Sequence, residues 1–245
     1  MVPPESAREC LENEYRYVKR PLLANINGRG AVQVESGRVI LVTSAQQGDG
    51  KTYTAFNLAR SFAQEPDWEV VLIDGDNIRP MLSRHLCRED RPGLIDALGE
   101  PSLTLDDVLV PTDIRHLSVI PSGQRDLLAT EYLSSRRMGE LMAQLTADER
   151  RIVLIDAPPL LGTSDALSLA ETAGQILIVV RAGVTLRAAV VAAVQPLDKR
   201  KSINLLLNQV VKVHGDTYGG YYCGYGYGNA PKSEGSGSAG RTTGL

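Results

Sequence analysis

Short apolar runs that alternate with helical patterns constrain the fold of this chain most. Runs of β-branched and aliphatic residues occupy 38–44, 70–74, 117–121, 151–156, 175–180 and 203–208. Continuous runs of this length are typical of strands buried on both faces of a parallel sheet. Helical patterns lie between several of them, at 51–65, 131–146 and 185–198. The alternation predicts an α/β domain with a doubly wound, mostly parallel sheet.

A glycine-rich loop, SAQQGDGKT at 44–52, joins the first apolar run to the first helical pattern. A phosphate-binding loop (P-loop) needs glycines around the phosphates, a lysine for the β- and γ-phosphates, and a hydroxyl for Mg²⁺. Gly48, Gly50, Lys51 and Thr52 supply these groups, although Ala45 replaces the first glycine of the usual motif. The loop therefore predicts an ATP site. The expected nucleotide contacts are Gln47, Gly48, Asp49, Gly50, Lys51, Thr52 and Tyr53.

Carboxylates end two of the apolar runs. Asp74 and Asp76 follow 70–73, and Asp156 ends 151–156. The carboxyl ends of parallel strands meet at one edge of the sheet, where such sheets bind ligands. Mg²⁺ bound to nucleotide phosphates needs one or two carboxylates besides the P-loop hydroxyl. A single aspartate at a strand end is more often a helix cap or turn residue than a ligand, but three beside a P-loop favour a metal and catalytic role.

Other polar residues follow strands at the same predicted edge. Asn208 closes the last run, where an amide can pair with the edge of adenine or form a turn. Arg79 and Arg181 can counter phosphate charge or form surface salt bridges. For both arginines the two interpretations stay open.

The C-terminal end differs in composition from the rest of the chain. Five of the nine tyrosines lie in YGGYYCGYGYG, and the last residues are rich in glycine and serine. Such a segment has few side chains to bury, so we expect residues 215–245 to form a flexible tail. The tyrosines offer a row of phenol hydroxyls or, alternatively, aromatic contacts with a neighbouring subunit. They are Tyr218, Tyr221, Tyr222, Tyr225 and Tyr227.

Composition excludes several classes of function. The formal net charge of −3 gives no basic excess for nucleic acid, and no apolar run approaches the length of about 18 residues needed for a membrane span. The first ten residues lack the apolar core of a secretory signal. The three cysteines are far apart, which favours reduced thiols over a disulfide framework. Residues 5–25 predict a charged helical arm that Pro21 interrupts.

Several motifs occur together and in order: SAQQGDGKT, LIDGDNIRP (72–80), PGLIDAL (92–98), IDAPPLLGTSDA (155–166), LLLN and the tyrosine-rich segment. This set resembles the bacterial tyrosine kinases of exopolysaccharide synthesis. The arm EYRYVKRPLLAN (14–25) resembles the exosortase-associated tyrosine autokinase subgroup. The resemblance implies a P-loop NTPase of the MinD/ParA-like type. It also implies an oligomerisation arm at 1–30, a kinase domain at 31–214 and the tail at 215–245.

The resemblance further implies a cytoplasmic ATP:protein-tyrosine phosphotransferase that modifies its own tail between the subunits of a ring. A membrane-bound chain-length regulator would activate it at the inner membrane, and a tyrosine phosphatase would be a further partner. By their positions in the motifs, Lys51 contacts phosphate, while Thr52, Asp76 and Asp156 hold Mg²⁺. Asp74 matches the candidate general base.

This chain departs from the family pattern at several positions. Asp49 stands where the family loop usually has Glu, and Ile78 stands where many members have Arg. Of the oligomerisation motif E-x-x-R-x-x-R, Arg16 matches and Lys19 matches in part. These departures bear on ring geometry more than on chemistry.

Two other functions compete with the kinase interpretation. A ParA/MinD-type partition ATPase would carry a second lysine early in the loop, where this chain has Ala45, Gln46 and Gln47. A nucleotide-dependent scaffold of a polysaccharide complex would bind ATP without physiological phosphotransfer. A phosphotyrosine blot after incubation with Mg·ATP separates the scaffold from the kinase.

Overall fold

The computed structural model describes residues 5–30, 34–86 and 91–210. The predicted tyrosine cluster at 218–227 lies outside these residues, and the proposed division of the chain at 30 and 214 stays a prediction. The described residues belong to one compact unit.

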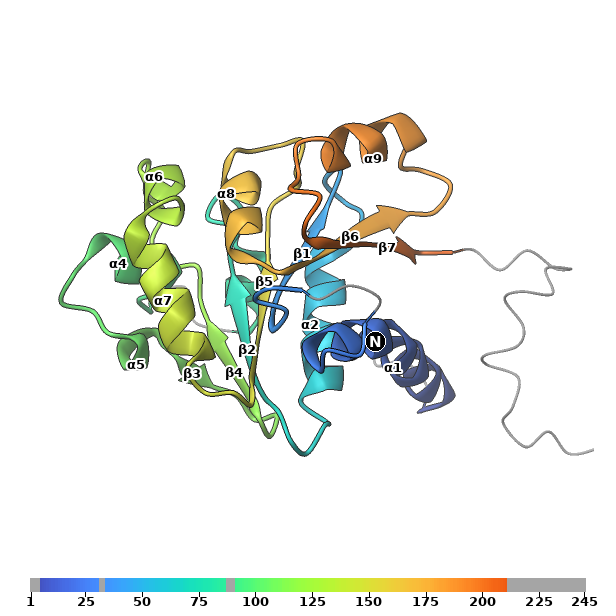
Figure 1. Cartoon of the computed structure of the whole chain (residues 1–245), viewed down its shortest axis with the longest axis horizontal. Helices are drawn as coiled ribbons and strands as arrows, with labels where there is room; N and C mark the ends of the chain where they lie inside the picture. Colours follow the sequence, from blue (N-terminus) through green and yellow to red (C-terminus); the bar gives the residue numbers. More distant parts are fainter. Residues whose placement is uncertain (1–4, 31–33, 87–90, 211–245) are drawn as a thin grey trace, which may run out of the picture. The chain divides into compact units, whose positions relative to one another are not determined.

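A single seven-stranded sheet forms the centre of the described part, in the order β3-β4-β2-β5-β1-β6-β7 (Figure 1). Six strands run parallel, and only β3 runs antiparallel to its neighbour β4. All six predicted runs are strands, and the predicted fold class is confirmed. The strands are β1 (Val39–Ser44), β2 (Glu69–Asp74), β3 (Val110–Pro111), β4 (Leu117–Ile120), β5 (Arg151–Asp156), β6 (Gln175–Arg181) and β7 (Ser202–Asn208).

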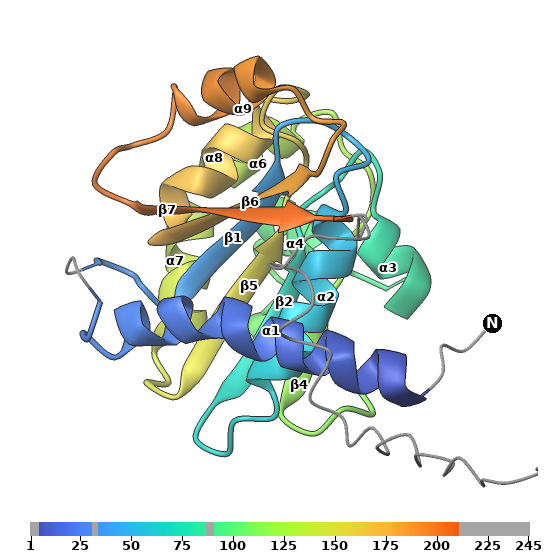
Figure 2. The same ribbon diagram turned by 90° about the vertical axis from the view of Figure 1, so that its right-hand side faces the viewer.

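Helices cover both faces of the sheet (Figures 1 and 2). Side chains of α1, α2 and α3 pack with one face, and those of α4 to α9 pack with the other. The helices are α1 (Glu5–Ile26), α2 (Lys51–Phe62), α3 (Met81–Leu86), α4 (Leu94–Gly99), α5 (Leu105–Val108), α6 (Ala129–Leu133), α7 (Arg136–Thr146), α8 (Asp165–Thr172) and α9 (Arg187–Val194).

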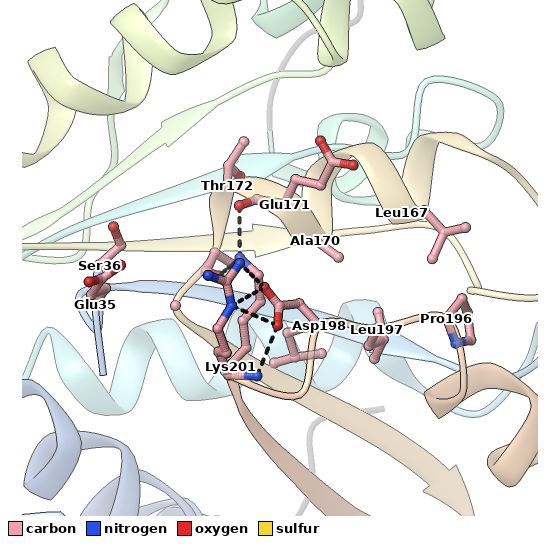
Figure 3. A pocket seen from close by; sticks show the side chains of 14 residues that line it. Glu35, Ser36, Leu167, Ala170, Glu171, Thr172, Pro196, Leu197, Asp198 and Lys201 are labelled. Carbon is pink, nitrogen blue, oxygen red and sulfur yellow. Dashed lines mark hydrogen bonds and ion pairs between the residues drawn. The ribbon is translucent and has the colours of Figure 1, made fainter. Parts of the chain in front are cut away.

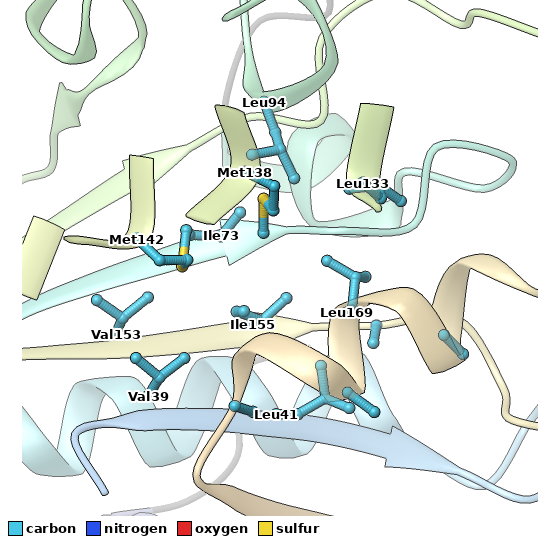
Figure 4. Close-up of a cluster of buried hydrophobic side chains, with 14 of the residues drawn as sticks. Val39, Leu41, Ile73, Leu94, Leu133, Met138, Met142, Val153, Ile155 and Leu169 are labelled. Atoms are coloured by element: carbon cyan, nitrogen blue, oxygen red, sulfur yellow. The ribbon is translucent and has the colours of Figure 1, made fainter. Parts of the chain in front are cut away.

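The two layers of helices explain why the strands are apolar throughout. Successive residues of a strand point to opposite faces, and in β1 the side chain of Leu41 packs in one core cluster while its neighbour Ile40 packs in the other. Figure 4 shows part of the first cluster, where Met138 and Met142 of α7 lie over the sheet. Burying one such aliphatic side chain contributes about 1.5–3 kcal/mol.

The predicted helix at 131–146 is two helices in the structure. α6 ends at Leu133 and α7 begins at Arg136. Between them, the Ser135 hydroxyl caps α7 by accepting a hydrogen bond from the Met138 N–H. The apolar spacing alone does not reveal this break, which the sequence marks only by Ser134 and Ser135, since serine is a preferred residue at helix N-caps.

One expectation about α1 is corrected. The helix does not stop at Pro21 but continues to Ile26. Pro21 lacks an N–H for the carbonyl of Tyr17, and both residues are exposed, so water can solvate that carbonyl.

Polar contacts fix α1 to the domain. The Lys19 ammonium lies 2.6 Å from a Glu65 carboxylate oxygen and donates to the Ser61 carbonyl at 2.7 Å. Near the helix end, the Asn25 amide donates to Gln175 at 2.8 Å. Lys19 thus faces inward, whereas Arg16 is exposed. The assembly roles of Arg16 and Lys19 stay predictions.

We predict that Lys19→Ala lowers the free energy of unfolding by about 1–3 kcal/mol, because the buried Ser61 carbonyl loses its hydrogen bond. Urea denaturation of both proteins measures the difference. Arg20→Ala is the matched control, since Arg20 is exposed and stacks on Tyr17 at 5.4 Å. The control should change stability by less than about 0.5 kcal/mol. Equal unfolding midpoints for wild type and Lys19→Ala would contradict the prediction.

Candidate active site

The P-loop lies between the end of β1 and the start of α2. Gly48 and Gly50 have φ values of 90° and 95°, a region that side chains disfavour. A Cβ atom on Gly50 would also lie 2.2 Å from the Asn208 amide nitrogen. Ala45 has no positive φ and is fully buried, which explains why alanine is accepted where the usual motif has glycine.

The lysine of the loop pairs with an aspartate of the neighbouring loop. The Lys51 ammonium lies 3.1 Å from Asp76 Oδ2, and both side chains are largely buried. Asp76 Oδ1 accepts a hydrogen bond from the Arg79 N–H at 2.9 Å. The structure therefore brings together two predicted site residues that lie 25 positions apart in the sequence.

Asp156 lies beside this pair in the interior. It is the β5 neighbour of Asp74 on β2, and it is almost completely buried. Burial raises its pKa to about 7, the Lys51 charge and the Thr52 hydroxyl lower it, and Asp74 and Asp76 raise it further. Among the described residues, its Oδ1 atom is a buried polar atom without a hydrogen-bond partner.

The residues present fit a Mg²⁺ ion that a nucleotide helps to hold. The unpartnered Asp156 oxygen and the nearby Asp76 carboxylate are hard oxygen ligands, and the Thr52 hydroxyl belongs to the same site. Within the described part of the chain, no three His, Cys, Asp or Glu side chains converge on their own as a metal site. Mg²⁺ typically needs only one or two carboxylates when phosphates and water complete its shell.

The Asp74 carboxylate has different hydrogen-bond partners from the Asp76 carboxylate. Its Oδ2 atom accepts hydrogen bonds from the Ser83 hydroxyl at 2.7 Å and the Ser83 N–H at 2.8 Å. Its Oδ1 atom accepts from the Asp76 N–H at 3.2 Å. Burial raises the Asp74 pKa to about 6, and the Ser83 hydrogen bonds oppose that rise. Asp74 thus lies behind the surface of the site, where it fixes α3 to the end of β2.

A cavity of about 820 Å³ opens beside the P-loop. Among the predicted residues, it contacts Gln47, Gly48, Gly50, Lys51, Thr52, Tyr53, Asp76 and Arg79. Residues that the sequence reasoning did not assign also line it: Gln46, Met81, Pro158, Pro159, Leu161, Gly162 and Thr163. Most of these belong to IDAPPLLGTSDA, a motif that indicated the family without indicating what its individual residues do. The buried Thr163 hydroxyl has no hydrogen-bond partner among the described residues.

Three predicted nucleotide contacts, Asp49, Arg181 and Asn208, do not line this cavity. The Asn208 amide donates to the Asp49 carbonyl at 2.9 Å, and the Thr185 hydroxyl donates to the Asp49 carboxylate at 2.6 Å. Arg181 is exposed at the end of β6. In this structure Asn208 supports the P-loop backbone. Its contact with adenine, and that of Arg181 with phosphate, stay predictions.

A second cavity, of about 810 Å³, lies at the opposite, amino-terminal edge of the sheet (Figure 3). Its basic groups already have partners. Arg200 pairs with Asp198 at 2.7 Å, and the Lys201 ammonium donates to the carbonyls of Glu171 and Ala173 at the end of α8. The P-loop cavity is therefore the better candidate for a phosphate ligand.

Comparison with known proteins assigns the family. Residues 37–206 match the AAA domain family. The tyrosine-protein kinase YwqD of Bacillus subtilis (strain 168) is 33% identical over 163 residues, which cover 66% of this chain and 68% of that protein. The chain belongs to the bacterial tyrosine kinase family. The crystal structure of the VpsO kinase domain agrees, with a TM-score of 0.70 and 28% identity over 84% of this chain and 98% of that domain.

A more distant likeness concerns the fold alone. The septum site-determining protein MinD of Pyrococcus horikoshii OT3, solved with Mg-ADP, aligns at a TM-score of 0.55 and 23% identity over 69% of each chain. This confirms the MinD/ParA-like fold. The chain spans less than a third of some longer tyrosine kinases that it also matches. Within the described residues, no helix has the length and apolar character to cross a membrane.

The raised pKa values of Asp74 and Asp156 predict a pH dependence. Both carboxyls ionise near pH 4 in an unfolded chain, so the folded protein binds more protons than the unfolded chain between about pH 4 and pH 7. Stability therefore falls as pH rises through this window. We expect the metal- and nucleotide-free protein to have a lower free energy of unfolding at about pH 8 than at about pH 5.

Urea denaturation in the presence of a chelator measures this difference. Asp156→Asn should raise stability at the higher pH by at least about 1 kcal/mol, since one pKa unit corresponds to about 1.4 kcal/mol. Asp67→Asn, a change of an exposed carboxylate, is the control and should leave the pH dependence as it is. A wild-type protein that becomes more stable from the lower to the higher pH would contradict the assignment.

Proposed function

We propose that this chain is an ATP-dependent protein-tyrosine autokinase that phosphorylates its own C-terminal tyrosine cluster in trans. It would thereby regulate exopolysaccharide synthesis or export. The observation that carries the proposal is the Lys51–Asp76 pair beside the unpartnered oxygen of Asp156. The acceptors are Tyr218, Tyr221, Tyr222, Tyr225 and Tyr227.

In phosphoryl transfer the protein mainly positions the reacting groups and neutralises the charge on the phosphates. Backbone N–H groups of the P-loop and the Lys51 ammonium would surround the β- and γ-phosphates. Lys51 would exchange its contact with Asp76 for the γ-phosphate, which frees the Asp76 carboxylate. Thr52, Asp76 and Asp156 would hold Mg²⁺, which when bound neutralises charge on the phosphate oxygens.

In the transfer step, the phenol oxygen of a tyrosine forms a bond to the γ-phosphorus while the bond from that phosphorus to the bridging oxygen of ADP breaks. The phenol proton passes to a carboxylate, because a phenol with a pKa near 10 is little ionised at neutral pH. We assign this base to Asp74. Asp74 is buried behind Asp76 and does not line the cavity, so the phenol would reach it after the backbone at Asp76, whose N–H donates to Asp74, moves aside.

The proposed acceptor is the tail of a neighbouring subunit. Tyr218 lies ten positions after Asn208 at the end of β7, and a stretch of this length can extend over at most about 36 Å. The length of this segment therefore permits transfer within one chain. The resemblance to the family favours transfer between subunits of a ring. A membrane-bound chain-length regulator as activator, a tyrosine phosphatase and a cytoplasmic location at the inner membrane belong to the same proposal.

We predict that Lys51→Met abolishes tail labelling by Mg·ATP, because the γ-phosphate loses its main cation. Mixing tests transfer in trans. The donor is a chain whose five tail tyrosines are replaced by Phe, and it should restore labelling on the Lys51→Met chain. Phosphotyrosine detection on the two chains, distinguished by size, measures the result. Lys199→Met, at an exposed lysine outside the site, is the control and should label normally. Labelling of Lys51→Met alone at the wild-type rate would refute the site.

We predict that Asp74→Asn slows transfer by about 10²-fold or more, the lower end of a general base's usual contribution. Affinity for Mg·ATP should change little, since Asp74 does not line the cavity. Asp76→Asn should instead weaken Mg·ATP binding, because Asp76 would contact the metal. Single-turnover labelling and titration with a fluorescent nucleotide separate the two effects. If Asp74→Asn loses nucleotide affinity while the rate of transfer per bound ATP is unchanged, then Asp74 is a metal ligand and the assigned roles of Asp74 and Asp76 are the wrong way round.

A further inference from the structure

One wall of the P-loop cavity is apolar although it faces solvent. Ile78, Met81 and Leu161 are 44%, 40% and 49% exposed, and all three line the cavity. Ile78 and Met81 follow β2, and Leu161 follows β5. Grouped exposure of large aliphatic side chains beside a binding site is typical of a contact surface for a ligand. We call these three residues the apolar wall.

The apolar wall lies on one side of the P-loop and the predicted base contacts lie on the other. In the sheet, β5 and β2 flank β1 on one side, whereas β6 and β7 flank it on the other. Asn208 and Arg181 end β7 and β6. A nucleotide with its phosphates in the P-loop and its base toward Asn208 would leave the apolar wall uncovered. The Lys51–Asp76 pair, which marks the place of the γ-phosphate, belongs to the same cavity as the wall.

We propose that the apolar wall is the subsite for the aromatic ring of the acceptor tyrosine. This inference rests on the proposed function and adds the residues that recognise the substrate. A tyrosine combines an apolar ring with a polar tip, and the cavity offers an apolar wall beside a phosphate site. The ring would pack on Ile78, Met81 and Leu161 while its hydroxyl points toward the γ-phosphate.

The same geometry selects tyrosine over serine and threonine. A serine or threonine hydroxyl has no ring to contact the apolar wall, so its peptide would lose that apolar contact area. The glycines that flank the tail tyrosines suit this subsite, because a residue without a side chain lets the peptide backbone approach closely.

The test measures peptide binding and nucleotide binding separately. The protein is the full chain with its five tail tyrosines replaced by alanine, so that its own tail does not compete. The probes are a fluorescein-labelled synthetic peptide of residues 216–228 and the same peptide with alanine at each tyrosine. Anisotropy titrations are made with Mg²⁺ and a non-hydrolysable ATP analogue, whose own affinity is measured independently.

We expect the tyrosine peptide to bind at least about tenfold more tightly than the alanine peptide. Leu161→Ser and Ile78→Ser should each weaken tyrosine-peptide binding several-fold, with nucleotide affinity within about twofold of the parent. Leu161→Met should retain most of the binding. Val191→Ser on α9, an exposed aliphatic position outside the cavity, is the matched control and should bind the peptide like the parent.

The remaining outcomes are distinguishable. If the serine variants bind the tyrosine peptide as the parent does, or if the two peptides bind equally, the subsite is overturned. If nucleotide affinity falls and peptide binding does not, the wall contacts the base and the inference is wrong. If the peptide binds as expected but the wild-type chain transfers no phosphate from Mg·ATP, the subsite stands and the proposed function fails.

Discussion

The parallel pairing of β1, β5 and β2 is the constraint on which the site depends. Its register sets Asp156 beside Asp74 at the edge where β1 ends and the P-loop begins. Burial there makes ionised carboxylates costly, and it raises the pKa of both residues. The Lys51 ammonium offsets part of this cost, because its charge lowers the pKa of Asp156. The edge is therefore short of positive charge, which a divalent cation would supply.

The P-loop is also supported from its other side. Asn208 and Thr185 both hold Asp49, so the ends of β6 and β7 are joined to the loop that would bind phosphate. The apolar wall lies on the opposite side of the loop, toward β5 and β2.

The sequence predicted the parts of this structure that depend on short-range patterns. Each all-apolar run is a strand, because both faces of the sheet are covered. The P-loop residues surround the expected cavity because glycine and lysine positions are fixed by the loop itself. Contacts between distant segments were not predictable in this way. Nothing in the spacing shows that Lys19 would turn inward, that Ser83 would bind Asp74, or that Leu161 would reach the P-loop cavity. These depend on how the helices pack on the sheet.

Intact-mass spectrometry of the purified full-length chain after incubation with Mg·ATP tests the central claim most directly. The account predicts added phosphate on the wild-type chain, none on Lys51→Met, and peptide maps that place the phosphate on tyrosines within 218–227. ATP that is bound and hydrolysed while the mass of the chain stays unchanged would contradict the account and favour a nucleotide-dependent scaffold. Phosphate found only on serine or threonine would contradict it as well.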